Sequence, residues 1–382
     1  MGKNANKKTK QNRNGDETMI KIFEAFAGYG TSSFALKQLG VEHELVGFSE
    51  IDKYAIECFK NNHCTKSLLD DWYAPLNYGD ITKINWSEVP DFDLLTGGFP
   101  CQAFSTAGKQ KGEADARGVL GLELTRALIE KQPKYFLFEN VKGFMSKRFK
   151  ETREKFVQSW VDAGYSVTYK VLNTKDFGVP QNRERVWFVG IRKDINKDFS
   201  FPEPFELKLK LKDVLEHNVD EKYFLKKEQV EKLFKHLKQQ KEKGNSFGVD
   251  ALPMDVNKSS RSLSARDYKQ PKCISTYRHS YLGFKGYDNI SVSLKSSEGS
   301  GNQALVIDRS KCVCNEGKDS MVYDGQVRRL TPKECFRLQG FLNDEVNLEG
   351  LSDTQKYKLA GNGQSVNVVK LLLKELLQGH KP

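Results

Sequence analysis

The sequence has no apolar run long enough to cross a membrane. Lys, Arg, Asp or Glu interrupts every apolar stretch before it reaches the ~18–20 residues that a spanning helix needs. The first 18 residues are basic and contain no apolar segment of the kind found in a secretory signal. We therefore expect no membrane partner, a flexible basic arm over residues 1–18 and a cytoplasmic location.

Cysteine is sparse, and the spacings of a metal site are missing. Seven cysteines are scattered over 382 residues, which suits a reducing cytosol better than a disulfide framework. Cys312 and Cys314 form the one close pair, and no second Cys or His pair at a matching spacing accompanies them. We expect no bound metal.

Acidic residues are scarce in two segments of a chain whose formal net charge is +11. Residues 1–14 carry five bases and no acid, and residues 258–285 carry seven bases, one acid and interleaved aromatic side chains. Bases among aromatics are typical of a nucleic-acid surface, although a solvated basic face is the commoner meaning of such a patch. The charge pattern alone leaves both interpretations open.

Short apolar strands alternate with helical patterns between residues 19 and 192. The predicted strands are Lys21–Phe26, Glu44–Glu50, Asp93–Phe99, Tyr135–Asn140, Ser166–Leu172 and Arg185–Arg192, and the predicted helices are Thr31–Leu39, Lys53–Lys60, 122–131 and 151–163. This alternation predicts an α/β fold with a doubly wound, mostly parallel sheet. Ligands of such sheets bind at the carboxyl ends of the strands.

The character of the sequence changes near residue 200. Residues 206–243 are rich in Lys and Glu and are expected to be helical in part, whereas 244–325 are rich in Ser, Gly and Asn with short β-like runs. The predicted organisation is a main domain over 19–200, a smaller, irregular β-rich domain over 201–325, a hinge segment over 326–349 and a segment over 350–382 that returns to the main domain. Helical patterns recur at 331–338 and 365–377.

A glycine-rich turn, Phe26-Ala-Gly-Tyr-Gly30, stands between the first strand and the first helix. Ser33 occupies the place of a third glycine, so the dinucleotide fingerprint is incomplete, and a simple turn explains the motif equally well. Glu50, however, ends the next predicted strand, where a carboxylate can accept hydrogen bonds from both ribose hydroxyls. Together the two features predict an adenosine-type cofactor.

Reactive side chains stand at the ends of three further predicted strands. Cys101 stands on a proline-fixed, glycine-flanked turn, and although a lone cysteine is usually buried and inert, such a loop is expected to expose it. Glu139 ends another strand, and Arg183 and Arg185 precede the last one. Guanidinium groups near a thiol lower its pKa and hold anionic or carbonyl groups.

With these motifs in this order, the chain resembles the DNA (cytosine-5)-methyltransferases. The resemblance covers nearly all of 20–200 and 325–370. It rests on Phe26-x-Gly-x-Gly30, Gly79-Asp-Ile81, Pro100-Cys-Gln102, Glu139-Asn-Val141, Gln181-x-Arg-x-Arg185, Arg329-Leu-Thr-Pro-x-Glu334 and Gly361-Asn362. It implies a fold of the Rossmann-like methyltransferase kind, and an enzyme that methylates cytosine C5 in a short sequence of double-stranded DNA. S-adenosylmethionine would be the methyl donor and S-adenosylhomocysteine the product.

The resemblance also implies a role for each site residue. Cys101 would add to C6 of a flipped-out cytosine, Glu139 would hydrogen-bond or protonate N3, and Arg185 would hold O2. Arg183 would support the loop and a nearby phosphate, and Asn140 would position the base and the Cys101 loop. The implied cofactor contacts are Phe26, Gly28, Gly30, Glu50, Ile51, Asp80, Ile81, Pro100, Leu120 and Asn362. The implied DNA contacts are Gln102, Ser105, Lys109, Lys111, Arg261, Arg266, Tyr268 and Arg278.

Residues 201–325 would then form the target-recognition domain of an enzyme expected to act as a monomer. The resemblance fits the methylase of a restriction-modification system, whose endonuclease would act on the same site without a stable complex, and equally a solitary phage methylase. An RNA (tRNA) cytosine-5 methyltransferase on the same scaffold and a non-enzymatic DNA-binding module are the alternatives. Two departures from the family pattern stand out: Gly361-Asn-Gly-Gln-Ser365 at the C-terminal motif, and Ala107 in place of a serine.

Overall fold

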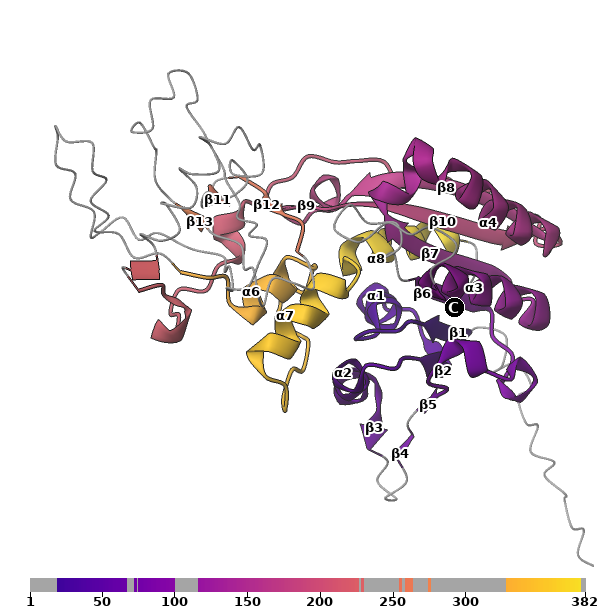
Figure 1. Ribbon diagram of the computed structural model, residues 1–382, viewed down its shortest axis with the longest axis horizontal. Coiled ribbons are helices and arrows are strands. Elements are labelled where there is room, and N and C mark those ends of the chain that lie inside the picture. Colours follow the sequence, from indigo (N-terminus) through magenta and orange to yellow (C-terminus); the bar gives the residue numbers. More distant parts are fainter. Residues whose placement is uncertain are drawn as a thin grey trace, which may run out of the picture.

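A seven-stranded sheet forms the centre of the molecule (Figure 1). The computed structural model describes residues 19–66, 72–73, 75–99, 116–226, 228–229, 254–255, 258–263, 274–275 and 328–378. The strand order is β5-β2-β1-β6-β7-β10-β8. The strands are β1 (Ile20–Ala25), β2 (His43–Ser49), β5 (Leu76–Asn77), β6 (Leu94–Gly98), β7 (Tyr135–Val141), β8 (Tyr165–Asn173) and β10 (Glu184–Arg192). All six strands predicted from the sequence are present, each within one residue of its expected ends.

The sheet is mostly parallel, which confirms the predicted fold class. β1 runs parallel to β2 and β6, β6 runs parallel to β7, and β2 runs parallel to β5. In this sheet β10 alone is antiparallel to its two neighbours, β7 and β8. The carboxyl ends of β1, β2, β6 and β7 therefore meet the start of β10 at one edge, where ligands of such sheets bind.

Helices cover both faces of the sheet. One face carries α1 (Thr31–Leu39), α2 (Lys53–His63), α6 (Pro332–Arg337), α7 (Asp353–Asn362) and α8 (Val366–Leu376), and the other carries α3 (Ala116–Lys131) and α4 (Lys150–Asp162). Successive strand residues enter opposite cores, as the two-residue period of a strand requires. Leu94 packs with the first group of helices, whereas Leu95 packs with the second.

The C-terminal helix α8 lies on the same face of the sheet as α1. α8 packs against α1, and its buried residues include Val366, Val369 and Leu373. α6 and α8 confirm the helices expected at 331–338 and 365–377. α7 was not predicted, because Tyr357 and Leu359–Gly361 are its only buried residues and they form no stripe at helical spacing.

Between β10 and α6, the described residues contain only short elements. Residues 206–226 include the 3₁₀ turns η7 (Leu211–Val214) and η8 (Glu221–Tyr223). Four two-residue strands form further parallel pairs, β9 (Gln181–Asn182) with β12 (Ser260–Arg261) and β11 (Met254–Asp255) with β13 (Ile274–Ser275). Most of the expected second domain lies outside the described residues, so that domain stays a prediction. None of the helices in the described ranges is long and apolar enough to span a membrane.

Candidate active site

The turn between β1 and α1 follows a left-handed backbone path. Phe26 and Gly28 have φ values of 51° and 59°, and Gly30, which precedes α1, has φ 82°. Non-glycine residues rarely adopt this conformation, and where they do the surrounding structure imposes it, often at a functional site. A Cβ atom added to Gly28 would meet no atom within 4 Å, so there is open space beside this turn.

The carboxylate of Glu50 is held against this turn. Its Oε2 accepts a hydrogen bond from the backbone N–H of Gly28 at 2.9 Å. Its Oε1 accepts from the N–H groups of Ile51 and Asp52 at 2.8 and 2.9 Å. Because each carboxylate oxygen has two lone pairs, Glu50 keeps acceptor capacity for a ligand hydroxyl while its orientation is fixed.

Asn77, which the sequence analysis did not identify, fixes the backbone next to Glu50. Its Oδ1 accepts from the N–H of Glu50 at 3.1 Å and from the N–H of Gly79 at 3.0 Å. Its Nδ2 donates to the carbonyl of Glu50 at 3.0 Å. Asn77 thus joins the end of β2 to Gly79, and its place in a two-residue strand left no pattern that would predict this role.

The surroundings of Glu50 suit an adenosine group. Ile51 is 76% exposed, the highest value for a large apolar side chain among the described residues. A Cβ on Gly79 would also meet no atom within 4 Å. Phe26 and Leu120 are partly buried and pack against the core on the α3 side of the sheet. An exposed apolar side chain beside open backbone and a fixed carboxylate offers a base-stacking surface next to a ribose acceptor.

The remaining predicted cofactor residues differ in exposure. Asp80 is partly exposed and accepts from the N–H of Thr82 at 3.1 Å. Ile81 is only 2% exposed, and its carbonyl accepts from Nη2 of Arg126 at 2.9 Å. The side chain of Ile81 therefore belongs to the core. Asn362, the last residue of α7, is exposed.

Glu24, which the sequence analysis also missed, is buried beneath the first turn of α1. It accepts hydrogen bonds from the N–H groups of Ser32 and Ser33 and from the hydroxyl of Ser33. Burial raises the pKa of Glu24 to about 7, although these hydrogen bonds act in the opposite direction. A lone acid inside the apolar run Ile20–Ala25 was the available signal.

This raised pKa predicts a pH-dependent stability. The folded protein keeps a proton on Glu24 that the unfolded chain releases above the ordinary glutamate pKa of 4.5. The free energy of unfolding should therefore fall as pH rises from 4.5 to 7, by about 3 kcal/mol from this group. Urea unfolding at a series of pH values should show that the free energy of unfolding falls less with rising pH in Glu24→Gln than in wild type. Identical pH profiles for the two proteins would contradict the assignment.

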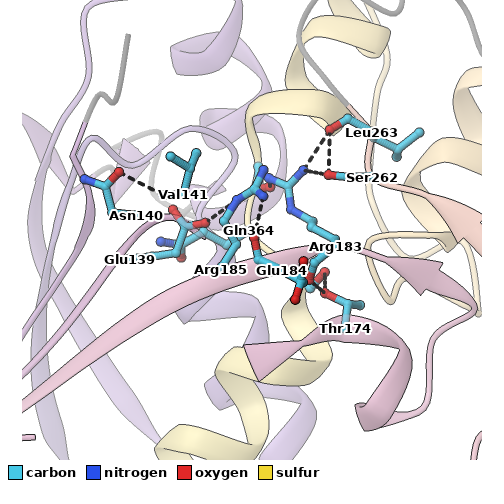
Figure 2. A network of polar contacts seen from close by, with 12 residues as sticks. Glu139, Asn140, Val141, Thr174, Arg183, Glu184, Arg185, Ser262, Leu263 and Gln364 are labelled. Carbon is cyan, nitrogen blue, oxygen red and sulfur yellow. Dashed lines mark hydrogen bonds and ion pairs between the residues drawn. The ribbon is translucent and has the colours of Figure 1, made fainter. Parts of the chain in front are cut away.

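Glu139 and Arg185 form a partly enclosed ion pair at the edge of the sheet where β7 ends and β10 begins. Glu139 lies on β7 and Arg185 on the adjacent β10, and their side chains are 11% and 17% exposed. Oε1 of Glu139 is 2.9 Å from Nε of Arg185, but the two atoms are not aligned as a hydrogen bond (Figure 2). The carboxylate is thus charge-paired while Oε1 lacks a hydrogen-bond donor among the described residues.

Polar atoms of Asn140 and Gln364 accompany this pair. Asn140 is 1% exposed, and its Oδ1 accepts from the N–H of Val141 at 2.8 Å while its Nδ2 has no partner within the described chain. A Cβ added to Gly98 would lie 2.9 Å from Nε2 of Gln364 and 3.2 Å from Oε2 of Glu139. Gln364, one of the departures from the family pattern, therefore reaches the space over Gly98 beside Glu139.

Arg183 is buried away from solvent, at 2% exposure. Its guanidinium donates to the backbone carbonyl of Leu263 (Figure 2). It also donates to the backbone carbonyls of Gly361 and Gly363. A side chain so enclosed presents no surface to a DNA phosphate in this arrangement. Of the two roles expected for Arg183, these contacts favour support over phosphate binding.

Several predicted site residues lie outside the described residues. Arg261 is described and is partly buried in β12, where its backbone pairs with Asn182. The others, which lie outside the described residues, are Pro100, Cys101, Gln102, Ser105, Ala107, Lys109, Lys111, Arg266, Tyr268 and Arg278. Their roles remain predictions.

The described residues contain no group of three or more His, Cys, Asp or Glu side chains arranged to hold a metal ion. Cys312 and Cys314 lie outside those residues. The polar groups that do converge at the sheet edge are two carboxylates, an arginine and two amides. Such groups can hydrogen-bond to the polar edges of an organic ligand.

The fold occurs in solved methyltransferase structures. The methyltransferase EhMeth of Entamoeba histolytica superposes with a TM-score of 0.66 at 16% identity, covering 95% of this chain and 99% of that chain. A DNMT2 variant of Spodoptera frugiperda gives a TM-score of 0.63 at 23% identity, covering 94% and 99%. At these identities the likeness shows the shared fold alone.

Sequence relatives extend the comparison. An orphan methyltransferase of Bacillus phage SPR is 32% identical over 94% of this chain and 97% of its own length. A type II methyltransferase of Neisseria lactamica is 31% identical over 94% and 96%. The model of the family described as C-5 cytosine-specific DNA methylase matches residues 20–378. With nearly the whole chain matched by this family model and by these relatives, this protein belongs to the C-5 cytosine-specific DNA methylase family.

Proposed function

We propose that this DNA cytosine-5 methyltransferase acts on a short specific sequence of double-stranded DNA, through covalent addition of Cys101 to C6 of a flipped-out cytosine. The observation that carries the proposal is the set of buried polar atoms at the end of β7. Oε1 of Glu139 and Nδ2 of Asn140 are buried without hydrogen-bond partners in the described chain. Oε1 of Glu139 has only its ion pair with Arg185. Because a buried polar atom without a hydrogen bond costs about 1–3 kcal/mol, these atoms support a polar partner beyond the described residues.

The edge of a cytosine ring is a suitable ligand for these groups. The carboxylic acid form of Glu139 donates to N3, and Arg185 supplies a positive charge for O2. Asn140 supplies a further donor, which suits either the base or the segment after β6. A base in a duplex presents this edge to its pairing partner, so the cytosine must leave the helix to be bound in this way.

The position of Gly98 supports Cys101 as the attacking group. Gly98 pairs with Glu139 across β6 and β7. Cys101 follows three residues later in the sequence, and three residues reach at most about 10 Å. This chain length is compatible with the proposed attack of Cys101 on a base bound by Glu139.

The covalent step begins when the Cys101 thiolate gives an electron pair to C6 and forms a C–S bond. The electrons of the C5–C6 double bond move toward C5 and N3, and Glu139 transfers a proton to N3. When bound, the cofactor would supply an electrophilic methyl group from its sulfonium for bond formation at C5. Water then takes the C5 proton, the C–S bond breaks with its electrons returning to sulfur, and N3 returns its proton to Glu139. The net products are 5-methylcytosine, S-adenosylhomocysteine and one proton.

The cofactor-binding part of the proposal rests on the first turn and on Glu50. Glu50 would accept from the ribose hydroxyls, Ile51 would cover one face of the adenine, and Gly28 would allow close approach of the backbone. Phe26, Gly30, Asp80, Leu120 and Asn362 would contribute at the margins of the same pocket. These assignments are supported by the fixed carboxylate and the exposed Ile51.

The sequence recognised should be one short motif. Bisulfite sequencing of DNA from a methylation-free host that expresses this chain is expected to show cytosines converted to 5-methylcytosine at a single motif. Exchange of residues 206–322 for the matching region of a relative should transfer the relative's motif, since we assign base recognition to this region. A chimera that kept the original motif would contradict that assignment.

The biological setting belongs to the same proposal. Relatives named type II methyltransferases and others named orphan methyltransferases both match this chain. We propose a restriction-modification methylase or a solitary phage methylase, acting as a monomer. Deletion of residues 1–17 should weaken DNA binding mildly and reduce its salt dependence without changing the motif.

A further inference from the structure

Gln181 links the main domain to residues 260–263 of the expected recognition region. It lies in β9, pairs with Ser260 of β12 and is 0% exposed. Its Oε1 accepts from the N–H of Leu263 at 2.9 Å, and its Nε2 donates to the carbonyl of Leu338. The backbone around residue 263 is therefore tied to the main domain and to the segment after α6.

Arg183, two residues further on, extends this connection to the C-terminal segment. Its Nη1 donates to the carbonyl of Leu263 at 2.9 Å and lies 3.4 Å from the hydroxyl oxygen of Ser262. The same nitrogen donates to the carbonyl of Gly361 at 3.3 Å, and Nη2 donates to the carbonyl of Gly363 at 2.8 Å. One side chain thus bridges backbone segments that are about 80 and 180 residues away in sequence.

The guanidinium group is suited to this bridge by its shape. It presents five N–H donors in a rigid plane, so it can bind acceptors on two sides at once. A lysine would keep the charge but could not reach the same set of carbonyls with fixed geometry. The arrangement therefore depends on the arginine side chain and not only on its charge.

The two bridged segments each lead to part of the proposed site. Leu263 leads into the basic and aromatic segment that we assign to DNA. Gly363 lies between Asn362, a proposed cofactor contact, and Gln364, whose amide reaches the space beside Glu139. The carbonyl of Gln364 also accepts from the hydroxyl of Tyr29 in the first turn, at 2.7 Å.

We propose that Arg183 is a positioning residue that holds residues 262–263 of the recognition region and the 361–363 turn in one arrangement. DNA bound on the first segment and cofactor bound near the second then require the same position of this side chain, so each ligand favours binding of the other. The inference rests on the proposed function for the identity of the ligands. It differs from a phosphate-binding role, in which Arg183 would act through its charge alone.

The test compares Arg183→Lys with wild type in two measurements that need no turnover. Dissociation constants for S-adenosylhomocysteine, with and without a cognate duplex, should show weaker cofactor binding by about tenfold and a coupling to DNA reduced from the typical 5–150-fold toward onefold. Amide hydrogen exchange without ligands should rise at both 262–263 and 361–365. The matched control is Arg192→Lys, at the opposite end of β10, which should change none of these values.

The outcomes separate the alternatives. A phosphate contact predicts near-normal cofactor binding for Arg183→Lys and unchanged exchange, and that result would overturn the proposal. A role in stability alone predicts a lower midpoint of unfolding with unchanged dissociation constants in the fully folded range, which would overturn it equally. Failure of wild type to bind S-adenosylhomocysteine would count against the proposed function instead.

A milder variant keeps the test decisive if Arg183→Lys does not fold. Ser262→Ala removes one hydroxyl contact of Arg183 at 3.4 Å. The proposal predicts a smaller but measurable rise of exchange across the bridge, at 361–363. A rise confined to the neighbours of residue 262 would contradict it.

Discussion

Replacement of Cys101 by Ala should abolish methyl transfer, because no other group in the proposed mechanism can form the bond to C6. Loss of a covalent nucleophile lowers turnover by on the order of 10⁶-fold in other enzymes. Binding of S-adenosylmethionine should be nearly unchanged, since the residues proposed to hold it lie on the first turn and around Glu50. Steady-state methyl transfer and equilibrium dialysis measure the two quantities.

Cys64→Ala is a suitable control, because Cys64 ends α2 and has no role in the proposed chemistry. A duplex with 5-fluorocytosine at the target gives a second readout. A base can remove hydrogen from C5 as a proton but cannot remove fluorine in this way. The adduct with Cys101 should therefore persist and appear as a shifted band on a denaturing gel. Substantial turnover by Cys101→Ala, or an adduct formed by that variant, would refute the nucleophile assignment.

Replacement of Glu139 by Gln should give the second large effect. The amide keeps the size of the side chain but cannot deliver a proton to N3, and loss of a general acid typically lowers the rate by about 10²–10⁴-fold. The change should appear in single-turnover methyl transfer, with little change in cofactor affinity.

Glu123→Gln provides a matched control for Glu139→Gln. Glu123 is also a partly buried carboxylate paired with an arginine, at 2.7 Å from Nη2 of Arg126. It lies on α3 and has no part in the proposed reaction, so its replacement should leave the rate unchanged. An unchanged single-turnover rate for Glu139→Gln would remove N3 activation from the mechanism.

The sheet and its functional edge were predictable because their signals are local. Alternating apolar strands and helical patterns gave each long strand within one residue at either end. Polar residues at the ends of such strands, Glu50 and Glu139 among them, had to lie at the same edge by the geometry of parallel strands. The contact between Glu139 and Arg185 follows from the pairing of β7 with β10.

Other features of the site had no signal in the sequence. Arg183 binds backbone carbonyls, and a carbonyl is the same whatever residue carries it, so nothing at Leu263, Gly361 or Gly363 marks the contact. Asn77 acts through a two-residue strand that is too short to show a period. The burial of Ile81 depends on packing against the core on the α3 side, which the neighbouring glycine and aspartate do not reveal.

Gln364 illustrates how a departure from a family pattern becomes interpretable once the packing is known. In sequence it only interrupted the expected C-terminal motif. In the structure its amide is beside Gly98 and Glu139, held by the contacts of Tyr29 and Arg183 to its own and neighbouring carbonyls.

Transfer of a methyl group from the cofactor to C5 of cytosine in DNA can be measured directly. The purified full chain is incubated with isotopically labelled S-adenosylmethionine and either unmethylated duplex DNA or tRNA, and the labelled nucleosides are identified by mass spectrometry. We expect 5-methyldeoxycytidine as the labelled product from DNA and no labelled product from tRNA. Label in N4-methyldeoxycytidine, N6-methyldeoxyadenosine or a tRNA nucleoside, or no label in DNA, would contradict this expectation.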